Sequence, residues 1–406
     1  VIVSNFVMEC KGFIESELNE PKRLVRLVSI GKTTSFMAID TKCFNGVSSF
    51  TELIESKGNF FFGGTKDDLL NLKKIVFSDG SEYTEAEALG YYPKQDFFVF
   101  SNGVLEGEAF CEPDKLGLAK GMYIPASAKS NLFNPDYHIQ RKFEFRTGSD
   151  FTNFKLWAEA MAKVHGAEAM LVCSAFLLAS FNFDVIAHER KFFPLLCLAG
   201  QKGSGKGTLA RGLLSLFSRE PDQTMVNNTT ATAFMRKLEQ YSNVPVWFDE
   251  FKNSLPEQKI EALKNIFDLI GKTVGVKSND ARTKQTRVTS PVIITGQEFP
   301  SDEALLSRCA ILNLKVKGNP TSEEKYDFNR LETECARGLG HVLIELMGYR
   351  ETIKKQCSEV YYEARKRLSA LVETRRIKVN SRLLDIYGVL ASVILTAFKA
   401  GLPIDF

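Results

Sequence analysis

The sequence lacks the cysteine and histidine spacing of structural metal sites. No two of its eight cysteines form a CxxC pair, and its four histidines lie far apart in the chain. Zinc sites need closely spaced Cys and His ligands, so we expect no metal cluster of this kind. Several cysteines lie in apolar runs, among them Cys173 in LVCSAF and Cys197 in PLLCLAG. Scattered, buried thiols are typical of a reducing compartment, and we expect a cytoplasmic protein without disulfides.

Long hydrophobic runs are also missing. No segment approaches the roughly 20 uninterrupted apolar residues that cross a bilayer. The longest apolar run, from Ala167 to Phe183, is interrupted by Glu168, Ser180 and Asn182, which predicts a buried helix. The first ten residues contain no basic start leading into an apolar block, the pattern of a secretory signal. We therefore expect no membrane contact.

Net charge is low, but its distribution is uneven. The chain has 52 basic and 49 acidic residues, which give a net charge of +3. Basic residues dominate between Gly271 and Val288 and again from Lys354 to Arg382. Basic clusters on a nearly neutral chain predict a local contact with a polyanion.

With 406 residues, 44% of them hydrophobic, the chain is long enough for two or three domains. We predict an N-terminal α+β domain over residues 1–150 and a helical segment over 151–190. An α/β core over 191–318 and a helical C-terminal region over 319–406 follow. In the first domain, aromatic residues such as Phe60 and Tyr91 are interpreted as core, with base stacking as the alternative. Thr65 and Asp68 predict the capped start of a helix.

The sharpest signal is a glycine-rich turn, GQKGSGKGT, between a buried strand at 192–198 and a helical run at 208–217. Glycines let successive backbone N–H groups point at phosphate oxygens, and the following helix adds a favourable dipole. This context predicts a P-loop. Lys206 would place a charge at the β- and γ-phosphates, and Thr208, or a water held by Gly207 and Thr208, would complete a magnesium shell. The residues expected to bind the nucleotide are Gly200, Gly203, Ser204, Gly205, Lys206, Gly207 and Thr208.

The P-loop alone does not identify the reaction. The GxxxxGK[ST] pattern is broken at Gly207, and the GSGKGT string also occurs in adenylate kinases. A second motif favours hydrolysis. The apolar run VPVWF ends in Asp249 and Glu250, where Asp249 would hold magnesium and Glu250 would polarise the attacking water. A nucleotide kinase has no need to activate water, although two acids that merely cap a strand remain an alternative.

Two further motifs follow along the chain. The buried run SPVIITGQ ends in polar side chains, of which Gln297 would orient the attacking water, with Thr295 as the rival. In ALLSR, Arg308 follows a short helix and would stabilise charge on the phosphate in a neighbouring subunit. An ion pair at the end of the helix is the other interpretation of Arg308.

A basic hairpin is predicted between the second and third motifs. Segments on both sides of Ser278-Asn279-Asp280 are β-prone. A positive hairpin could grip a phosphate backbone without reading its sequence, while a solvated surface hairpin is the alternative. The residues expected to contact DNA are Lys277, Arg282, Lys284 and Arg287.

Together these motifs resemble the AAA+ group of P-loop ATPases. Within that group they are most similar to superfamily III helicases and to the helicase modules of primase-helicases from phages, plasmids and bacterial mobile elements. The resemblance is specific from about Phe192 to Val316. It is looser over GYYPKQDFFVFSNGVL, which is similar to the domain upstream in those helicases.

The resemblance implies a parallel sheet flanked by helices and a homo-hexameric ring that moves along single-stranded DNA with ATP and Mg²⁺. It implies Gln297 as the sensor, Arg308 as a finger reaching the next subunit, and a primase as a partner in replication. The sequence departs from the family pattern at Gly207, where a hydroxyl residue is usual, and at Gln297, where Asn is usual. An AAA+ switch that does not act on DNA is the alternative function.

Overall fold

The computed structural model describes residues 3–78, 80–271, 273–275, 283–316 and 318–405. The chain divides into two compact units. The first comprises Val1–Glu87 and Val99–Arg141, and the second comprises Ala88–Phe98 and Lys142–Phe406. The domain limits predicted from the sequence, at residues 150, 190 and 318, stay predictions.

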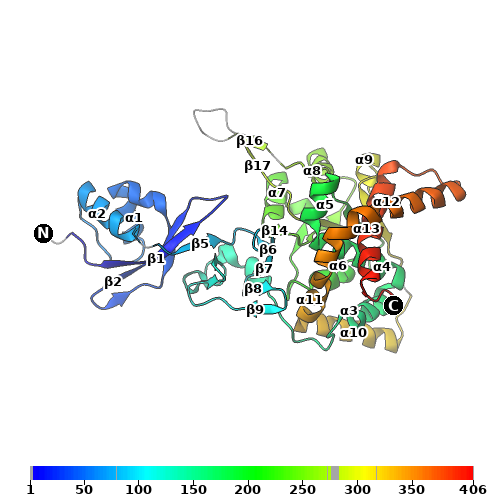
Figure 1. Cartoon of the computed structure of the whole chain (residues 1–406), viewed down its shortest axis with the longest axis horizontal. Helices are drawn as coiled ribbons and strands as arrows, with labels where there is room; N and C mark the ends of the chain where they lie inside the picture. Colours follow the sequence, from blue (N-terminus) through cyan, green and yellow to red (C-terminus); the bar gives the residue numbers. More distant parts are fainter. Residues whose placement is uncertain (1–2, 79, 272, 276–282, 317, 406) are drawn as a thin grey trace. The chain divides into compact units, whose positions relative to one another are not determined.

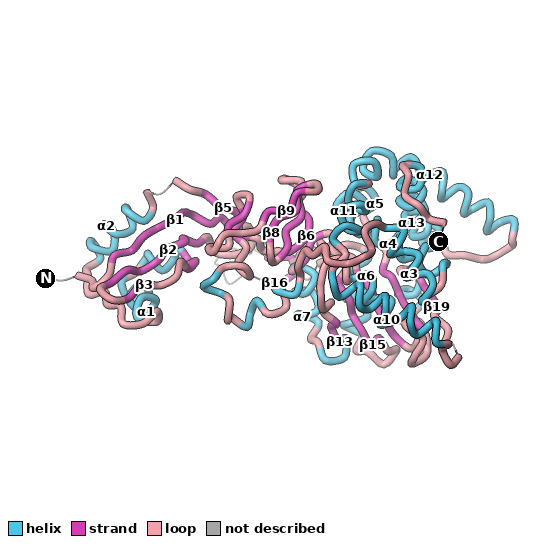
Figure 2. The backbone as a smooth tube through the Cα atoms, turned by 90° about the horizontal axis from the view of Figure 1, so that it is seen from below, coloured by secondary structure: helices cyan, strands magenta, loops and turns pink. Residues whose placement is uncertain are grey.

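The first unit is built on a mixed sheet whose longest strands are the antiparallel pair β1 and β2. Figure 2 shows these two strands running side by side, with α1 and α2 beside them. Both helices contribute to one apolar core with the strands, through residues such as Phe50 and Leu69. The elements are β1 (Val7–Glu15), β2 (Lys22–Ser29), β3 (Lys32–Thr33), β4 (Met37–Asp40), α1 (Val47–Glu55), α2 (Lys66–Val76), β5 (Glu82–Glu85), β8 (Gly103–Glu106), β9 (Ala109–Cys111), β10 (Leu118–Ala119) and β11 (Met122–Tyr123).

Local sequence signals in this part of the chain are confirmed. Thr65 and Asp68 form a reciprocal capping box at the start of α2, which satisfies two backbone donors that a helix start leaves unpaired. Phe60, Phe62 and Tyr91 are buried, so core packing is the correct interpretation for these three rings. Strand β6 (Leu89–Tyr92) belongs to the second unit, and β7 (Phe97–Phe100) begins there.

The second unit contains a sheet of parallel strands in the order β13, β15, β18, β12, β19. From β12 the chain passes to β13 at one edge of the sheet, and it later returns to add β19 on the other side of β12. Ligands bind at the carboxyl ends of strands at such a reversal. The strands are β12 (Leu195–Ala199), β13 (Gln223–Met225), β15 (Val246–Phe251), β18 (Val292–Gly296) and β19 (Cys309–Asn313), and a separate strand, β14 (Tyr241–Ser242), pairs with β6.

Helices lie beside this sheet, as Figure 2 shows for β13, β15 and β19. Three helices, α3 to α5, precede its first strand, and α4, which contains most of the apolar run from Ala167 to Phe183, is mostly buried. The chain ends in a helical region in which α12 and α13 lie side by side (Figure 1). The helices are α3 (Phe154–His165), α4 (Ala167–Phe181), α5 (Phe183–Arg190), α6 (Lys206–Leu214), α7 (Ala231–Glu239), α8 (Glu257–Phe267), α9 (Glu303–Leu306), α10 (Ser322–Arg337), α11 (Gly340–Gly348), α12 (Arg350–Thr374) and α13 (Ser381–Lys399).

Polar contacts attach the C-terminal helices to the rest of the second unit. Arg350, at the start of α12, donates to both carboxylate oxygens of Asp184 and to the carbonyl of Phe181, at the end of α4. On α10, the carboxylate of Glu334 accepts hydrogen bonds from the hydroxyl of Ser149 and the backbone of Asp150. The C-terminal helices therefore belong to the same compact body as the parallel sheet.

Helix α13 is long and apolar enough to cross a membrane by length and composition alone, which differs from the sequence-based expectation. Half of its apolar window is buried inside the protein, where the helix contacts α12, α4 and β19. Helices α4 and α5 pass the same test only together, and the chain bends by 83° between them.

The thiol and metal expectations can be compared with the structure directly. All eight cysteines are free, and Cys173, Cys197 and Cys309 are among the buried ones. Burial raises the pKa of the Cys197 thiol to about 12, because a thiolate is poorly solvated there. Within the described ranges, no group of three or more His, Cys, Asp or Glu side chains could hold a metal ion.

Candidate active site

The predicted P-loop lies between a buried strand and a helix. Strand β12 ends at Ala199, and α6 begins at Lys206 with Gly205 as its N-cap. The Nζ of Lys206 donates to the carbonyl of Gln201 at 3.2 Å, and the hydroxyl of Thr208 donates to the carbonyl of Gly205 at 2.7 Å. The loop is therefore closed on itself, with the N-terminus of α6 at its end.

Two glycines in this loop are required by its geometry. A Cβ at Gly200 would lie 2.3 Å from the carbonyl oxygen of Leu314, which follows β19, so any larger residue would push the loop away from the sheet. Gly205 has φ +85°, a left-handed conformation that costs other residues roughly 1–2 kcal/mol. The first glycine of the GxxxxG pattern is thus required by a close approach to the sheet, and the second by its left-handed backbone.

Gly207, where a hydroxyl residue is usual, lies against the neighbouring strand. A Cβ at this position would make ordinary contact with the ring of Trp247, 3.9 Å away. One turn later, the guanidinium of Arg211 lies 5.9 Å from the centre of the same ring. The first turn of α6 therefore packs on the face of β15 that carries Trp247. Asp249 is two residues further along β15, so its side chain lies on the same face.

Asp249 is held by side chains from the two neighbouring strands. Thr295 on β18 donates to one carboxylate oxygen of Asp249, and Gln223 on β13 donates to the other. The hydroxyl of Thr295 in turn accepts a hydrogen bond of 2.9 Å from the buried indole of Trp247. Because each strand contributes one group, the order of strands in the sheet fixes the position of this carboxylate.

The two candidates for the sensor position differ in their surroundings. Thr295 is fully buried and contacts Asp249 directly. Gln297 lies just beyond the end of β18 and is exposed, and its side chain forms no hydrogen bond with the described part of the chain. The geometry favours Thr295 as the residue that orients Asp249, while the role predicted for Gln297 stays a prediction.

We expect Thr295→Val to lower ATP turnover roughly 10- to 150-fold, because a hydrogen bond to a charged group contributes roughly 1.5–3 kcal/mol. It should also lower the free energy of unfolding by about 1–3 kcal/mol, since the buried indole of Trp247 loses its acceptor. Steady-state hydrolysis and thermal unfolding measure both effects. Gln297→Ala is the comparison variant, and a larger loss of turnover in that variant would make Gln297 the sensor.

Glu250 lies in a bulge at the end of β15. Between Phe248 and Phe251 this strand has one residue more than its partner strand between Ile294 and Gly296. Glu250 itself has φ +60°, and its carbonyl accepts a hydrogen bond from the side chain of Asn227. Left-handed backbone at a residue other than glycine is strained and is concentrated at functional sites. The bulge turns the exposed Glu250 side chain out of the alternation of the strand.

The residues at this edge of the sheet fit a nucleotide with magnesium. The hydroxyl of Ser204 is buried and has no hydrogen-bond partner among the described residues, so a donor in the P-loop is left for a phosphate oxygen. Thr208 and Asp249 offer the hydroxyl and carboxylate oxygens that Mg²⁺ prefers. Magnesium bound with a nucleotide usually takes only one or two protein ligands, and phosphate and water supply the others. Thr208 and Asp249 are therefore enough, and a cluster of three or more carboxylates is not required.

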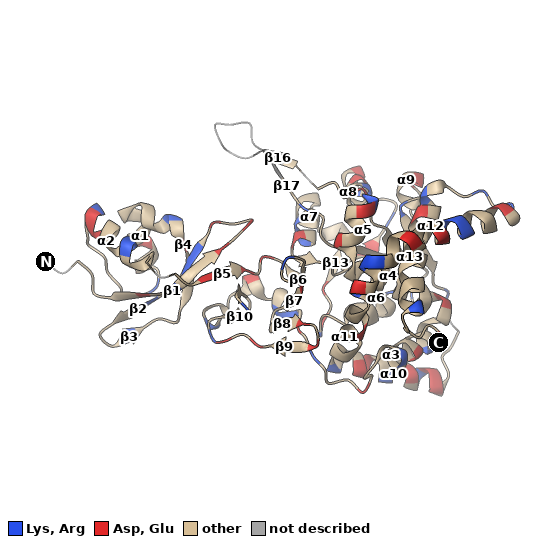
Figure 3. Ribbon diagram, viewed as in Figure 1, with Lys and Arg blue, Asp and Glu red and all other residues tan. Residues whose placement is uncertain are grey.

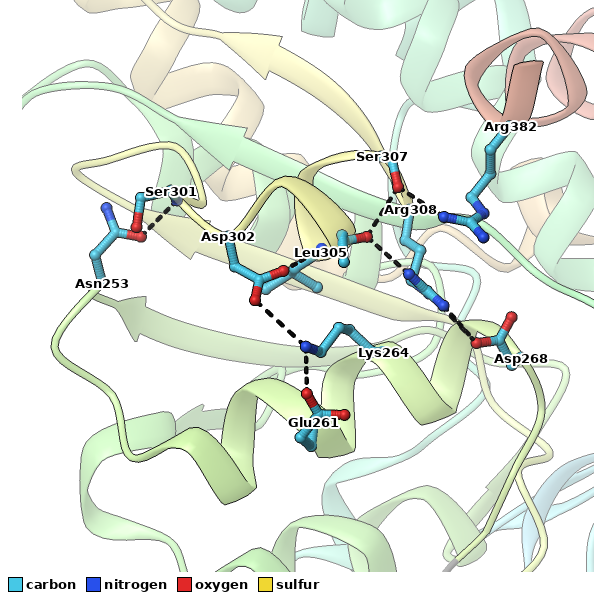
Figure 4. A network of polar contacts seen from close by, with 11 residues as sticks. Asn253, Glu261, Lys264, Asp268, Ser301, Asp302, Leu305, Ser307, Arg308 and Arg382 are labelled. Carbon is cyan, nitrogen blue, oxygen red and sulfur yellow. Dashed lines mark hydrogen bonds and ion pairs between the residues drawn. The ribbon is translucent and has the colours of Figure 1, made fainter. Parts of the chain in front are cut away.

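Arg308 lies at the far end of the sheet from its own P-loop. Its carbonyl accepts a hydrogen bond from Leu195, the first residue of β12, whereas the P-loop follows Ala199. Those four strand steps correspond to about 13 Å. The guanidinium also turns toward α8, where it pairs with Asp268 at 2.8 Å (Figure 4). The ion pair that the alternative interpretation of Arg308 predicted therefore forms within a single chain.

Polar side chains around Arg308 keep the surrounding segments in place. Asp302 accepts from the backbone of Leu305 and so caps α9, and Lys264 on α8 pairs with Asp302 at 3.3 Å. Arg382, at the start of α13, donates to the hydroxyl of Ser307 at 2.9 Å. Figure 4 shows these groups as one network that joins α8, α9 and α13.

The expected hairpin is confirmed as an antiparallel pair, β16 (Thr273–Gly275) and β17 (Thr283–Gln285), which forms a sheet of its own. Lys277 and Arg282 lie outside the described residues, and Lys284 is placed only by its backbone in β17.

The chain after β17 is fastened to the end of α7. The backbone N–H of Arg287 donates to the carboxylate of Glu239. The hydroxyls of Thr289 and Ser290 donate to the carbonyls of Leu238 and Tyr241.

The second basic stretch, on α12 and the following segment, is partly neutralised, and both charge signs occur along α12 in Figure 3. Its ion pairs are Lys354 with Glu351, Arg365 with Asp385 and Arg367 with Glu363.

Several residues near the P-loop and Asp249 have no motif that sequence reasoning could recognise. Gln223 and Trp247 act on Asp249 through strand order. Asn227 holds the backbone of Glu250. His165, the last residue of α3, borders the P-loop, since a Cβ on Gly205 would lie 3.6 Å from its Nδ1. A polar residue at the end of an otherwise apolar strand does give a sequence signal, and it makes Thr295 the rival of Gln297.

Comparison with known proteins gives a likeness in fold. No protein-family model and no curated protein sequence matches the chain. Among solved structures, the SCCmec type IV Cch active helicase matches with a TM-score of 0.58 and 14% identity, over 98% of this chain and 71% of that chain. The NrS-1 C-terminal region matches with a TM-score of 0.34 and 12% identity, over 97% of this chain and 87% of that chain. The JCV helicase matches with a TM-score of 0.26 and 17% identity, over 54% and 70%.

The last two likenesses are too weak to support an argument. The first extends over nearly the whole chain, although its identity of 14% establishes fold alone. The predicted α/β architecture with a parallel sheet and flanking helices is confirmed. The chain therefore shares its fold with a helicase, and the resemblance stated from its motifs is confirmed at that level.

Proposed function

We propose that this protein hydrolyses ATP with Mg²⁺ and uses the energy to move along single-stranded DNA as a helicase. The observation that carries the proposal is the meeting of the P-loop helix and Asp249 on one face of the sheet, through Gly207 and Trp247. A phosphate-binding loop beside a fixed carboxylate is the arrangement that phosphoryl transfer to water requires. The fold shared with the Cch helicase supports the same conclusion.

Each residue has a defined task in this proposal. Lys206 binds the β- and γ-phosphates, and Ser204 and the backbone N–H groups of the loop bind further phosphate oxygens. Thr208 and Asp249 hold magnesium, which when bound with the nucleotide neutralises negative charge on the phosphates. Thr295 and Gln223 keep the Asp249 carboxylate in place. Glu250 accepts the proton of the water that attacks the γ-phosphate.

The remaining site residues concern neighbouring molecules. Arg308 is too far along the sheet to serve its own P-loop, which supports a homo-hexameric ring in which it completes the next subunit's site. The hairpin with Lys277, Arg282, Lys284 and Arg287 contacts the phosphate backbone of DNA. A cytoplasmic role in replicating a phage or mobile element, with a primase as partner, rests on the resemblance of the motifs.

Single-stranded DNA should raise the steady-state rate of ATP hydrolysis at low salt. Because backbone contacts depend on counterion release, the stimulation should fade between about 50 and 200 mM salt. Phosphate release with and without oligothymidylate measures it. Lys206→Ala, purified in the same way, controls for contaminating ATPases.

Turnover that is independent of DNA at every salt concentration would contradict the translocase. In that case the ATPase would be a regulatory AAA+ switch that does not act on DNA.

A further inference from the structure

The first unit contains a cavity of about 530 Å³ that the proposed ATPase site does not use. Its volume lies within the range of small-ligand sites, on the order of 300–1,000 Å³. Strands β2 and β4 contribute to its lining, together with residues between 129 and 137. All of its lining residues belong to the first unit.

Three lysines from separate segments converge on this cavity. Lys22 comes from β2, Lys57 from the turn after α1, and Lys129 from the short 3-10 helix Lys129–Asn131. Lys22 is paired with the buried carboxylate of Glu85. Within the described part of the chain, no carboxylate lies at ion-pairing distance from Lys57 or Lys129. Like charges gathered without counter-charges are unfavourable, and they raise the local concentration of anions.

Aromatic side chains accompany these lysines. Tyr123 is buried, and Tyr137 is half-buried in the wall. Burial, and the nearby carboxylate of Glu85, raise the pKa of Tyr137, so its hydroxyl remains a neutral hydrogen-bond donor. Phe133 is 92% exposed. An exposed aromatic ring beside a basic cavity is suited to stacking on a nucleic-acid base.

The segment of residues 129–137, which carries Phe133 and Tyr137 and forms the aromatic wall, is held in place by hydrogen bonds. Both Nη atoms of Arg141 donate to this segment, one to the carbonyl of Asn131 at 3.1 Å and the other to that of Asn134 at 2.9 Å. The amide of Asn131 donates to the carbonyl of Pro125 at 3.0 Å. Asn131 and Asn134 line the cavity themselves and flank Phe133. A wall fixed in advance loses little freedom when a ligand binds.

We propose that this cavity binds a nucleotide segment of single-stranded nucleic acid, with the phosphate at Lys57 and Lys129 and a base against the aromatic wall. Lysines and aromatic rings together recognise the features that all nucleotides share, so the site would bind without sequence preference. The choice of a strand as ligand rests on the proposed translocase function. The first unit would then hold the strand on which the second unit acts.

The test is a double variant, Lys57→Ala with Lys129→Ala, whose side chains are exposed. Binding of labelled oligothymidylate is followed by fluorescence anisotropy without ATP. Each phosphate contact on a single strand contributes about 0.7 to the slope of log K against log salt, so the variant should lose about 1.4 of this slope. At about 0.1 M salt, this corresponds to roughly 25-fold weaker binding.

Lys66→Ala with Lys74→Ala is the matched control. It removes the same charge from exposed positions on α2 in the same unit, away from the cavity. Its affinity should stay within about twofold of the wild type, because two distant surface charges are largely screened at this salt concentration. Thermal unfolding verifies that both double variants are folded.

The outcomes separate the two proposals. If the wild type binds the strand and the Lys57/Lys129 variant binds as tightly with the same slope, the cavity proposal is wrong and the translocase stands. If binding depends on these lysines while ATP turnover ignores DNA, the cavity proposal stands and the translocase fails. Thymidine monophosphate is the second probe. Tight binding of this mononucleotide without binding of the oligonucleotide would overturn the assignment to a strand.

Discussion

Glu250→Gln should bind ATP as the wild type does and turn it over about 100- to 10,000-fold more slowly, the range that loss of a general base produces. Glutamine has the size of glutamate but cannot accept the proton of the attacking water. The Glu250 carboxylate is exposed and has no hydrogen-bond partner among the described residues. The free energy of unfolding should therefore change by less than about 0.5 kcal/mol.

Two measurements isolate the chemical step. Equilibrium binding of a fluorescent ATP analogue reports the nucleotide site, and single-turnover hydrolysis reports the reaction itself. Lys206→Ala is the contrasting variant, because the loss of its charge at the phosphates should weaken binding of the analogue. A fully active Glu250→Gln protein would remove Glu250 from the reaction and leave the strained bulge without a catalytic explanation.

Arg308→Ala should lower ATP turnover by about 1,000-fold or more, the range for loss of an arginine that stabilises a transferring phosphoryl group. Mixing this variant with Glu250→Gln should restore part of the activity. In a mixed ring, an Arg308→Ala subunit keeps an intact Glu250 and can receive the arginine of a Glu250→Gln neighbour. Recovery of turnover on mixing two inactive proteins, measured at constant total protein, is the expected result.

The ion pair between Arg308 and Asp268 supplies the matched control. Asp268→Asn removes the carboxylate that Arg308 contacts and keeps the guanidinium itself. Since a partly exposed pair contributes roughly 0–1 kcal/mol to stability, this variant should fold and hydrolyse ATP. If Asp268→Asn loses as much activity as Arg308→Ala and mixing restores nothing, Arg308 serves only to attach α9 to α8.

The parts of the site that depend on local chemistry could be predicted from the sequence. A buried strand, a turn with glycines at fixed spacing and a following helix were recognisable because each has a short-range cause. Gly205, for example, has φ +85°, a backbone conformation that favours glycine whatever the rest of the fold. The same holds for the capping box of Thr65 and Asp68 and for the apolar strand that ends at Asp249 and Glu250.

Strand order determined what could not be predicted. Gln223, Trp247 and Thr295 meet at Asp249 only because β13 and β18 lie on either side of β15. That arrangement depends on crossover connections and leaves no mark in any one segment. The separation of Arg308 from its own P-loop has the same origin, since it follows from which ends of β19 and β12 are adjacent.

The cavity of the first unit also could not be predicted from the sequence. Lys22, Lys57 and Lys129 are far apart in the sequence, and neither region 271–288 nor region 354–382, where basic residues are concentrated, includes them. The stretch from Lys354 to Arg382 stands out in the sequence, yet several of its charges are paired within α12 or with Asp385 on α13. Local charge density is therefore a poor guide to where positive charge remains unpaired after folding.

The attachment of the chain after β17 has a mechanical consequence. Between β17 and β18, the hydroxyls of Thr289 and Ser290 donate to the carbonyls of Leu238, in the last turn of α7, and Tyr241, in β14. Tension applied to the β16–β17 pair would reach α7 before it reached β18. The strand that holds Thr295 against Asp249 is thus shielded from the pull. A force on the β16–β17 pair would therefore leave the distance between Thr295 and Asp249 unchanged.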